Sequence, residues 1–572
     1  MWWPGTDRGV NVLARRDVTR GMSTSTDLVV TNARVYTCDP ASSWAEAIAV
    51  SDGLITAVGT AADVAEHVGA DTVVVDAGGR MVMPGLADVH THLMLGGNAM
   101  AWELTMPPSA TLEEILTAVE AHARTLAADE WIVGGIVGSP VLDELASGGY
   151  LAALDRAAGG RPVVLRDDSY HNRWVNSVAL ERMGIDESTP APPTGIIGKD
   201  RNGHLTGLLY ESASDLAENA AAAAIADAAG RDRVAIGTAI SLMNSFGITA
   251  IQDAATLEPS LRALSDLDDK GELTAWVVGT LPARPWMSDN IAGNDLYVAA
   301  PAYRRNQVRP DFAKFFLDGV PMTRTSALLQ PYLCHGPHED PADVGPLFWS
   351  DDELLDALER CHAAGLGAKF HATGDRAVQQ ALNAVEIFRE RHGAGRLFHI
   401  AHVAYIAPAD LARFAALGVV ADASPYIWFP TPFAGIINSQ VPPAIVDRSW
   451  PFRDLLDHRA VLAVGSDWPV VPSPNPWIAL EALITRANPD PDIDGQSNPS
   501  AAITLSEAIS VLTTSGAEAM GMGETNGVIT PGRSADFIVL NHNLFDVEAT
   551  EIHRTTALQT YFRGRRVHGT EL

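Results

Sequence analysis

The middle of the chain alternates between short apolar runs and longer amphipathic segments. Runs such as ITAIQD (248–253), GAKFHA (367–372) and VLAVGSD (461–467) are mostly apolar until their ends, which is typical of strands buried on both faces. Between such runs lie helical patterns with one apolar face, including DDELLDALERCHAAG and DRAVQQALNAVEIFRERHG. Alternation of strand and helix predicts a parallel sheet with the helices outside it.

The strand candidates exceed by one the eight strands of a (β/α)8 barrel. They are 86–90, 162–166, 248–253, 274–280, 312–318, 367–372, 396–402, 419–424 and 461–467. The surplus candidate is 162–166, because it lies within residues 93–245, a stretch too long for a single crossover. We therefore expect a deformed TIM barrel in which 93–245 forms an inserted lobe near the active site.

Both ends of the chain show a different pattern of short, β-branched runs closed by Gly, Asn or Asp. Examples are DLVVTNARVYT and DTVVVDAGGRMVMP near the start, and GVITPGRSADFIVLN near the end. They predict one small β-sandwich domain built from residues 26–84 and 521–568, with the barrel inserted as residues 85–520. Residues 1–25 lack a periodic pattern. They are interpreted as a disordered or non-native extension, so translation could start at Met1 or at Met22.

Composition and charge narrow the class of protein. The 572 residues are 47% hydrophobic and 19% charged, which suits a globular enzyme with a large core. A net charge of −30 argues against nucleic-acid and anionic-membrane partners, which require a basic surface. No run approaches the roughly 18 consecutive apolar residues of a membrane span. The 3 cysteines share no metal-type spacing and suggest a reducing, cytoplasmic location.

Polar residues fall where the predicted barrel strands end, which is where catalysis occurs in this fold. Each has an ordinary alternative role: a single histidine can be a satisfied polar group, a lysine an ion-pair member, and an aspartate a turn cap. The H-x-H pair in PGLADVHTHL is more specific, since alternation places both rings on one strand face. The coincidence of all of them favours a metal site. The residues are His90, His92, Lys314, His371, His402 and Asp467.

These motifs resemble the amidohydrolase superfamily, and within it the branch often called YtcJ-like or N-substituted formamide deformylase-like. The resemblance covers roughly residues 26–568. Its matching segments are MPGLADVHTHL, WVNSVAL, TGLLYESA, GITAIQDA, AKFFLDG, FHATGDRAV, HIAHV, GSDWPV and PGRSADFIVL. The combination of H-x-H, the strand lysine, HATGDRA and the late Ser-Asp is what makes it specific.

The resemblance implies a role for each strand-end residue. His90 and His92 would hold the more buried metal, while His371 and His402 would bind a second one. Lys314 matches a lysine that is carboxylated in many relatives and bridges two metals. Asp467 would bind metal and act as the general base. One or two divalent ions are implied, with Zn²⁺ the best match to nitrogen and oxygen ligands, and a homodimer is also implied.

The implied reaction is hydrolysis of a carbon–nitrogen bond other than a peptide bond (EC 3.5), in an amide, a formamide or a related N-substituted small molecule. A metal lowers the pKa of a bound water, and Asp467 accepts the proton. An alternative is hydrolytic deamination of a ring, although that chemistry usually lacks a carboxylated lysine. A non-catalytic barrel is the third reading, and it predicts eroded ligand positions, which this sequence does not show.

Other positions depart from the family or carry weaker signals. Relatives often have Glu-His where this chain has Ala401–His402, which removes a carboxylate from beside the site. The loop DGVPMTRTSA also differs from the family pattern, and we expect this change to affect the substrate pocket more than the metal site. His171, Trp468 and Arg324 are candidate substrate-binding residues. Arg324 is alternatively expected to pair with Asp318.

Overall fold

The computed structural model describes residues 26–107, 109–167, 172–192, 195–285, 290–334, 340–424 and 428–571. Its centre is a sheet of eight parallel strands in the order β21-β20-β19-β18-β17-β16-β15-β8. The strands are β8 (Leu86–Thr91), β15 (Ile248–Asp253), β16 (Trp276–Pro282), β17 (Val308–Phe316), β18 (Gly367–Ala372), β19 (Phe398–His402), β20 (Val419–Ala423) and β21 (Leu462–Val464). Neighbours in space therefore follow chain order, as in a TIM barrel.

Burial explains why these segments form strands. Every residue of β8, β15, β16, β19, β20 and β21 is buried. Helices pack outside the sheet, and their apolar faces join the strands in one large core. They include α8 (Ala228–Ser245), α9 (Glu258–Asp269), α10 (Gly293–Ala299), α11 (Asp351–Ala363), α12 (Asp375–His392), α13 (Leu411–Leu417), α16 (Phe452–Asp457) and α18 (Leu505–Leu512). The prediction of a parallel sheet covered by helices is confirmed.

The barrel closes where the segment after β21 meets β8. The amide of Asp467 donates to the carbonyl of His90 at 2.6 Å, and the amide of His92 donates to the carbonyl of Trp468 at 2.8 Å. Gly465 permits this approach, because a Cβ at that position would lie 2.1 Å from Cβ of His90. The end of the last strand is thus bonded to the end of the first.

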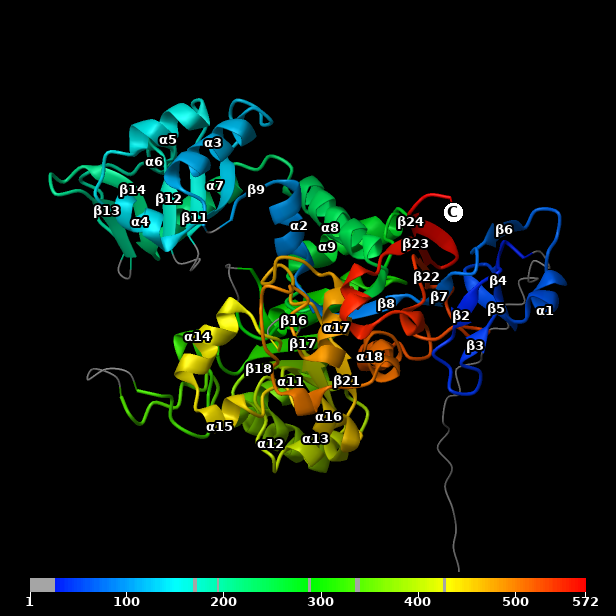
Figure 1. Cartoon of the computed structure of the whole chain (residues 1–572). Coiled ribbons are helices and arrows are strands. Elements are labelled where there is room, and N and C mark those ends of the chain that lie inside the picture. The colour runs from blue at the N-terminus through cyan, green and yellow to red at the C-terminus, as the bar shows by residue number, and fades with distance from the viewer. Residues whose placement is uncertain are drawn as a thin grey trace, which may run out of the picture.

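Most of the residues between β8 and β15 form a separate lobe, as Figure 1 shows in cyan, whereas α8 returns to the barrel. Its six-stranded sheet has the order β13-β14-β12-β11-β10-β9. The strands are β9 (Leu104–Thr105), β10 (Ile132–Val137), β11 (Val163–Asp167), β12 (Asn172–Val175), β13 (Gly195–Lys199) and β14 (Leu205–Glu211). The surplus strand of the sequence pattern, predicted at 162–166, is β11. It belongs to this lobe and not to the barrel.

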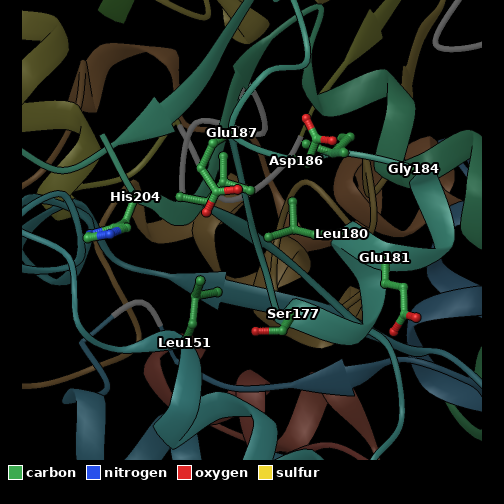
Figure 2. A pocket seen from close by; sticks show the side chains of 10 residues that line it. Leu151, Ser177, Leu180, Glu181, Gly184, Asp186, Glu187 and His204 are labelled. Carbon is green, nitrogen blue, oxygen red and sulfur yellow. The ribbon is translucent and has the colours of Figure 1, made fainter. Parts of the chain in front are cut away.

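Helices of the lobe pack on its sheet, and α2 (Leu93–Ala101) connects the lobe to the barrel directly after His92. The lobe helices are α3 (Leu112–Ala123), α4 (Ser139–Leu145), α5 (Leu151–Ala158), α6 (Ser177–Met183) and α7 (Ser214–Ala223). The lobe carries a pocket with a volume of about 510 Å³. It is lined by the start of α5, by α6 and the loop 184–187 that follows it, and by the start of β14 (Figure 2). None of its lining residues belongs to the barrel sheet.

The two ends of the chain form two further sheets, to the side of the barrel away from the lobe (Figure 1). One has the order β24-β23-β22-β7-β2-β3, and the other has the order β5-β4-β1-β6. Strand β22 (Phe537–Leu540) pairs antiparallel with β7 (Met81–Pro84), which joins late and early segments in one sheet. The remaining strands are β1 (Leu28–Thr31), β2 (Arg34–Tyr36), β3 (Trp44–Ala45), β4 (Ala47–Ser51), β5 (Leu54–Gly59), β6 (Val73–Asp76), β23 (Ala557–Phe562) and β24 (Arg565–His568).

This arrangement confirms the predicted β domain made from both chain ends. Apolar side chains from both sheets form a shared core, including Val30, Val50, Val82, Phe537 and Tyr561. In the part of the chain that the structure describes, no helix is both long and apolar enough to cross a membrane.

Candidate metal centre

Three of the predicted ligands converge where the barrel closes. His90 lies in β8, His92 directly follows it, and Asp467 lies in the loop after β21. One ligand atom from each falls within 4.8 Å of the others. Asp467 Oδ1 is 3.7 Å from Nε2 of His90 and 3.4 Å from Nε2 of His92. This spacing is what a shared cation between two imidazoles and a carboxylate requires.

Lys314 reaches the same point from β17. Its side chain is almost fully buried, and its Nζ lies 3.1 Å from Nε2 of His90. Burial, together with the nearby charge of Lys369, lowers the pKa of Lys314 to about 7. Among the described residues no carboxylate lies within ion-pair distance of this amine. Lys314 is therefore available as a neutral amine near neutral pH.

His371 is the penultimate residue of β18 and His402 is the last residue of β19, and their ring centroids are 4.4 Å apart. Nε2 of His371 lies 3.0 Å from the carbonyl oxygen of Gly319. The ring of His402 lies 4.8 Å from that of His90, and its Nδ1 contacts Oγ of Ser424 at 2.5 Å. The backbone of His402 has a φ of 75°, in the left-handed region, so the strand ends at this residue.

Burial keeps these imidazoles neutral. The pKa of His371 falls to about 4, first because of burial and then because of Lys314. The pKa values of His90 and His402 fall well below the usual value, again chiefly through burial. A neutral imidazole has the lone pair that a metal requires. Nε2 of His402 is moreover buried without a hydrogen-bond partner among the described residues. The residues present therefore fit a divalent metal ion.

Sequence reasoning missed two buried residues beside these ligands, Lys369 in β18 and Asp422 in β20. Oδ2 of Asp422 lies 2.9 Å from Nδ1 of His90 and 2.8 Å from Nζ of Lys369. Asp422 is in register with Ala401, so a carboxylate faces the site from the strand next to the position where relatives often carry Glu. Lys369 precedes His371 by two residues in GAKFHA, and that spacing places both on one face of the strand. This spacing from His371 could have identified Lys369 from the sequence.

The structure describes two of the three predicted substrate-binding residues, Trp468 and Arg324. His171 lies outside the described residues. Trp468 is buried, and it packs so closely on α2 that a Cβ at Gly96 would lie 2.1 Å from its ring. Arg324 binds Oδ2 of Asp343 at 3.0 Å and the carbonyl of Leu333 at 2.8 Å.

The alternative expectation that Asp318 pairs with Arg324 is wrong. Asp318 accepts instead from the backbone amides of Ala327, Thr373 and Gly374, at 2.9 to 3.0 Å. Burial raises the pKa of this carboxyl to about 7, although those amides lower it. A carboxylate that is satisfied by backbone donors has no need of a guanidinium partner.

Comparison with known proteins agrees with this arrangement. The model of the amidohydrolase family matches residues 73–568. N-substituted formamide deformylase of Arthrobacter pascens is 27% identical over 567 residues, covering 95% of this chain and 98% of that protein. A Bacillus subtilis (strain 168) protein that carries the name amidohydrolase YtcJ is 25% identical over 545 residues, covering 93% and 98%.

Solved structures show the same fold. An uncharacterized metal-dependent hydrolase from Pyrococcus horikoshii superposes with a TM-score of 0.73 at 21% identity, covering 91% of this chain and 99% of that one. An uncharacterized metal-dependent hydrolase from Pyrococcus furiosus superposes with a TM-score of 0.69, covering 90% of this chain and 99% of that one. Since the family model spans most of the sequence, from the early strand β6 to the last strand, the chain belongs to the amidohydrolase family.

Proposed function

We propose that this protein is a metal-dependent hydrolase that cleaves the carbon–nitrogen bond of an N-substituted amide or formamide. The observation that carries the proposal is the convergence of His90, His92 and Asp467 within 4.8 Å at the C-terminal mouth of the barrel. Lys314, His371 and His402 stand beside them on neighbouring strands. The family membership and the name of the Arthrobacter pascens relative support this reaction class.

The two imidazoles and Asp467 would hold the first divalent ion, for which Zn²⁺ fits the nitrogen and oxygen donors. His371 and His402 would hold a second ion. A bound divalent metal supplies two things here, a lowered pKa for a coordinated water and polarisation of the scissile carbonyl.

Asp467 is suited to move the proton. Its side chain is 15% exposed, whereas that of His90 is 1% exposed, so Asp467 is the more accessible of the two. As water attacks the carbonyl carbon, the Asp467 carboxylate accepts a proton from that water. The resulting carboxylic acid then donates the same proton to the leaving nitrogen, which departs as an amine.

Lys314 is the residue suited to carboxylation. The lone pair of a neutral amine attacks the carbon of carbon dioxide, and loss of one proton from nitrogen leaves a carbamate anion. A pKa of about 7 makes the neutral form of Lys314 available, and the carbamate would replace a buried amine by an anionic oxygen donor. Lys369, the other buried lysine here, is held instead by Asp422.

The test is a hydrolysis screen with metal-free protein reconstituted separately with zinc, manganese, cobalt or iron. Substrates should span N-substituted formamides, acylamines, carbamates and aminated rings. We expect chelation to abolish hydrolysis and metal to restore it, with formamides or acylamines the best substrates. Turnover that survives complete removal of metal would refute the proposal. Turnover confined to aminated rings would replace it by hydrolytic deamination.

A further inference from the structure

The side chain of Lys369 spans the interior of the barrel. Lys369 lies in β18, the fifth barrel strand in chain order, and β8 is the first. Its side chain is 0% exposed, and its Nζ donates to the carbonyl of Val89 in β8, directly before His90. The same Nζ donates to Oδ2 of Asp422 in β20 at 2.8 Å. One buried amine thus connects three strands of the barrel wall.

Asp422 continues this connection to a ligand. The oxygen that accepts from Lys369 also lies 2.9 Å from Nδ1 of His90. Side chains of Asp422 and His90 are 0% and 1% exposed, so no bulk water competes for this contact. Lys369 therefore positions the carboxylate of Asp422, and that carboxylate contacts the imidazole of His90.

We propose that Lys369 and Asp422 are positioning residues that fix the ring and the tautomer of His90. This inference rests on the proposed function, because it assigns the two residues to the metal centre described above. Asp422 accepts the proton on Nδ1, which leaves the lone pair on Nε2. That nitrogen faces Nζ of Lys314 at 3.1 Å and Oδ1 of Asp467 at 3.7 Å.

The chemistry explains why the pair would matter. A carboxylate behind an imidazole fixes the ring orientation and makes its other nitrogen a better donor to a metal. In a dry interior the carboxylate itself needs a donor to keep its place, and Lys369 supplies one. His402 differs, because the partner of its Nδ1 is the hydroxyl of Ser424. The ring of His90 is thus in contact with one member of a buried lysine–aspartate pair.

The experiment measures zinc affinity by competition with a chromogenic chelator. The proteins are the full-length wild type, Asp422→Ala, Asp422→Asn, Lys369→Met and the double variant Lys369→Met/Asp422→Ala. Asp422→Ala should weaken zinc binding by about 10- to 100-fold, as loss of such partners does. Asp422→Asn keeps a hydrogen-bond acceptor without the negative charge, so it should lose less zinc affinity than Asp422→Ala. The double variant should bind zinc no more weakly than Asp422→Ala alone, because both substitutions act through His90.

The matched control is Asp536→Asn. Asp536 is another buried carboxylate, bonded to Nε1 of Trp276 at 2.8 Å and to the amide of Arg563. This control should lower the unfolding temperature of the metal-free protein and leave zinc affinity unchanged. If Asp422→Ala lowers the unfolding temperature but binds zinc as the wild type does, the pair is only structural and the inference is overturned.

A second measurement tests the inference without substituting Lys369 or Asp422. Nitrogen-15 NMR of the metal-free wild type, with His90 assigned by its loss in His90→Gln, should show the proton on Nδ1. A proton on Nε2 overturns the inference even if the variants of the pair fail to fold. Failure of the wild type to bind zinc at all would instead count against the proposed function. The two failures are therefore distinguishable.

Discussion

Asp467 donates its backbone amide to the carbonyl of His90 at 2.6 Å, and its carboxylate lies 3.7 Å from the imidazole of the same residue. Two candidate ligands from opposite ends of the barrel sequence are therefore bonded through their backbones. The geometry of the site depends on how the last strand closes against the first.

Gly465→Ala should disturb this closure. The added Cβ would lie 2.1 Å from Cβ and 2.3 Å from the amide nitrogen of His90, and backbone atoms cannot rotate away. Overpacking of this kind typically costs about 1–3 kcal/mol. Thermal unfolding should show lower stability, and metal analysis should show lower occupancy. The control is Gly237→Ala in α8, where a Cβ has no neighbour within 4 Å. Equal stability of the two variants would contradict the prediction.

Asp467→Asn should cut turnover by about 100-fold or more, because loss of a general base removes the proton acceptor. Turnover should be measured at matched metal content, since Asp467 is also a candidate ligand. The exposed Asp71→Asn serves as the control for a simple change of charge. Turnover within a few-fold of the wild type at equal metal content would eliminate the assigned role.

Lys314→Ala should reduce bound metal, because it removes the amine that would carry the carbamate. Short carboxylic acids such as acetate should partly restore metal content and activity by supplying the missing oxygens. The exposed Lys270→Ala should show neither the loss nor the rescue. Full metal occupancy in Lys314→Ala, measured by elemental analysis, would argue against a bridging carbamate.

Asp536 should make stability depend on pH. Burial raises its pKa from 3.8 to about 6, although its hydrogen bonds lower it. The folded protein then keeps a proton that the unfolded chain has lost, so this contribution is complete below the unfolded pKa and disappears as pH rises through about 6.

The free energy of unfolding of the wild type, relative to Asp536→Asn, should therefore fall as pH rises from about 4 to about 6. The slope should approach about 1.4 kcal/mol per pH unit inside this window. Denaturant titrations at several pH values measure it. A difference that is flat across the window would show that the carboxyl titrates normally in the folded protein.

The order of the barrel strands could be predicted from the sequence, because strand burial and helix amphipathicity are local patterns. Even the surplus strand could be assigned to the lobe, since a crossover has a limited length. The same local patterns placed His90, Lys314, His371 and Asp467 at or near the ends of strands or in the loops that follow. Parallel strands bring such positions to one mouth of a barrel, so their proximity follows from the alternation alone.

Only the tertiary structure decided which buried groups are partners. Lys369 and Asp422 lie within apolar runs, and nothing local shows that one oxygen serves both Lys369 and His90. Asp318 likewise accepts from the backbone amide of Ala327 in the following loop and from that of Thr373 after β18, where the sequence suggested Arg324 as its partner. The physical reason is distance. Periodicity determines the face on which a side chain lies, whereas a contact across the barrel depends on strand stagger, side-chain length and the absence of competing water.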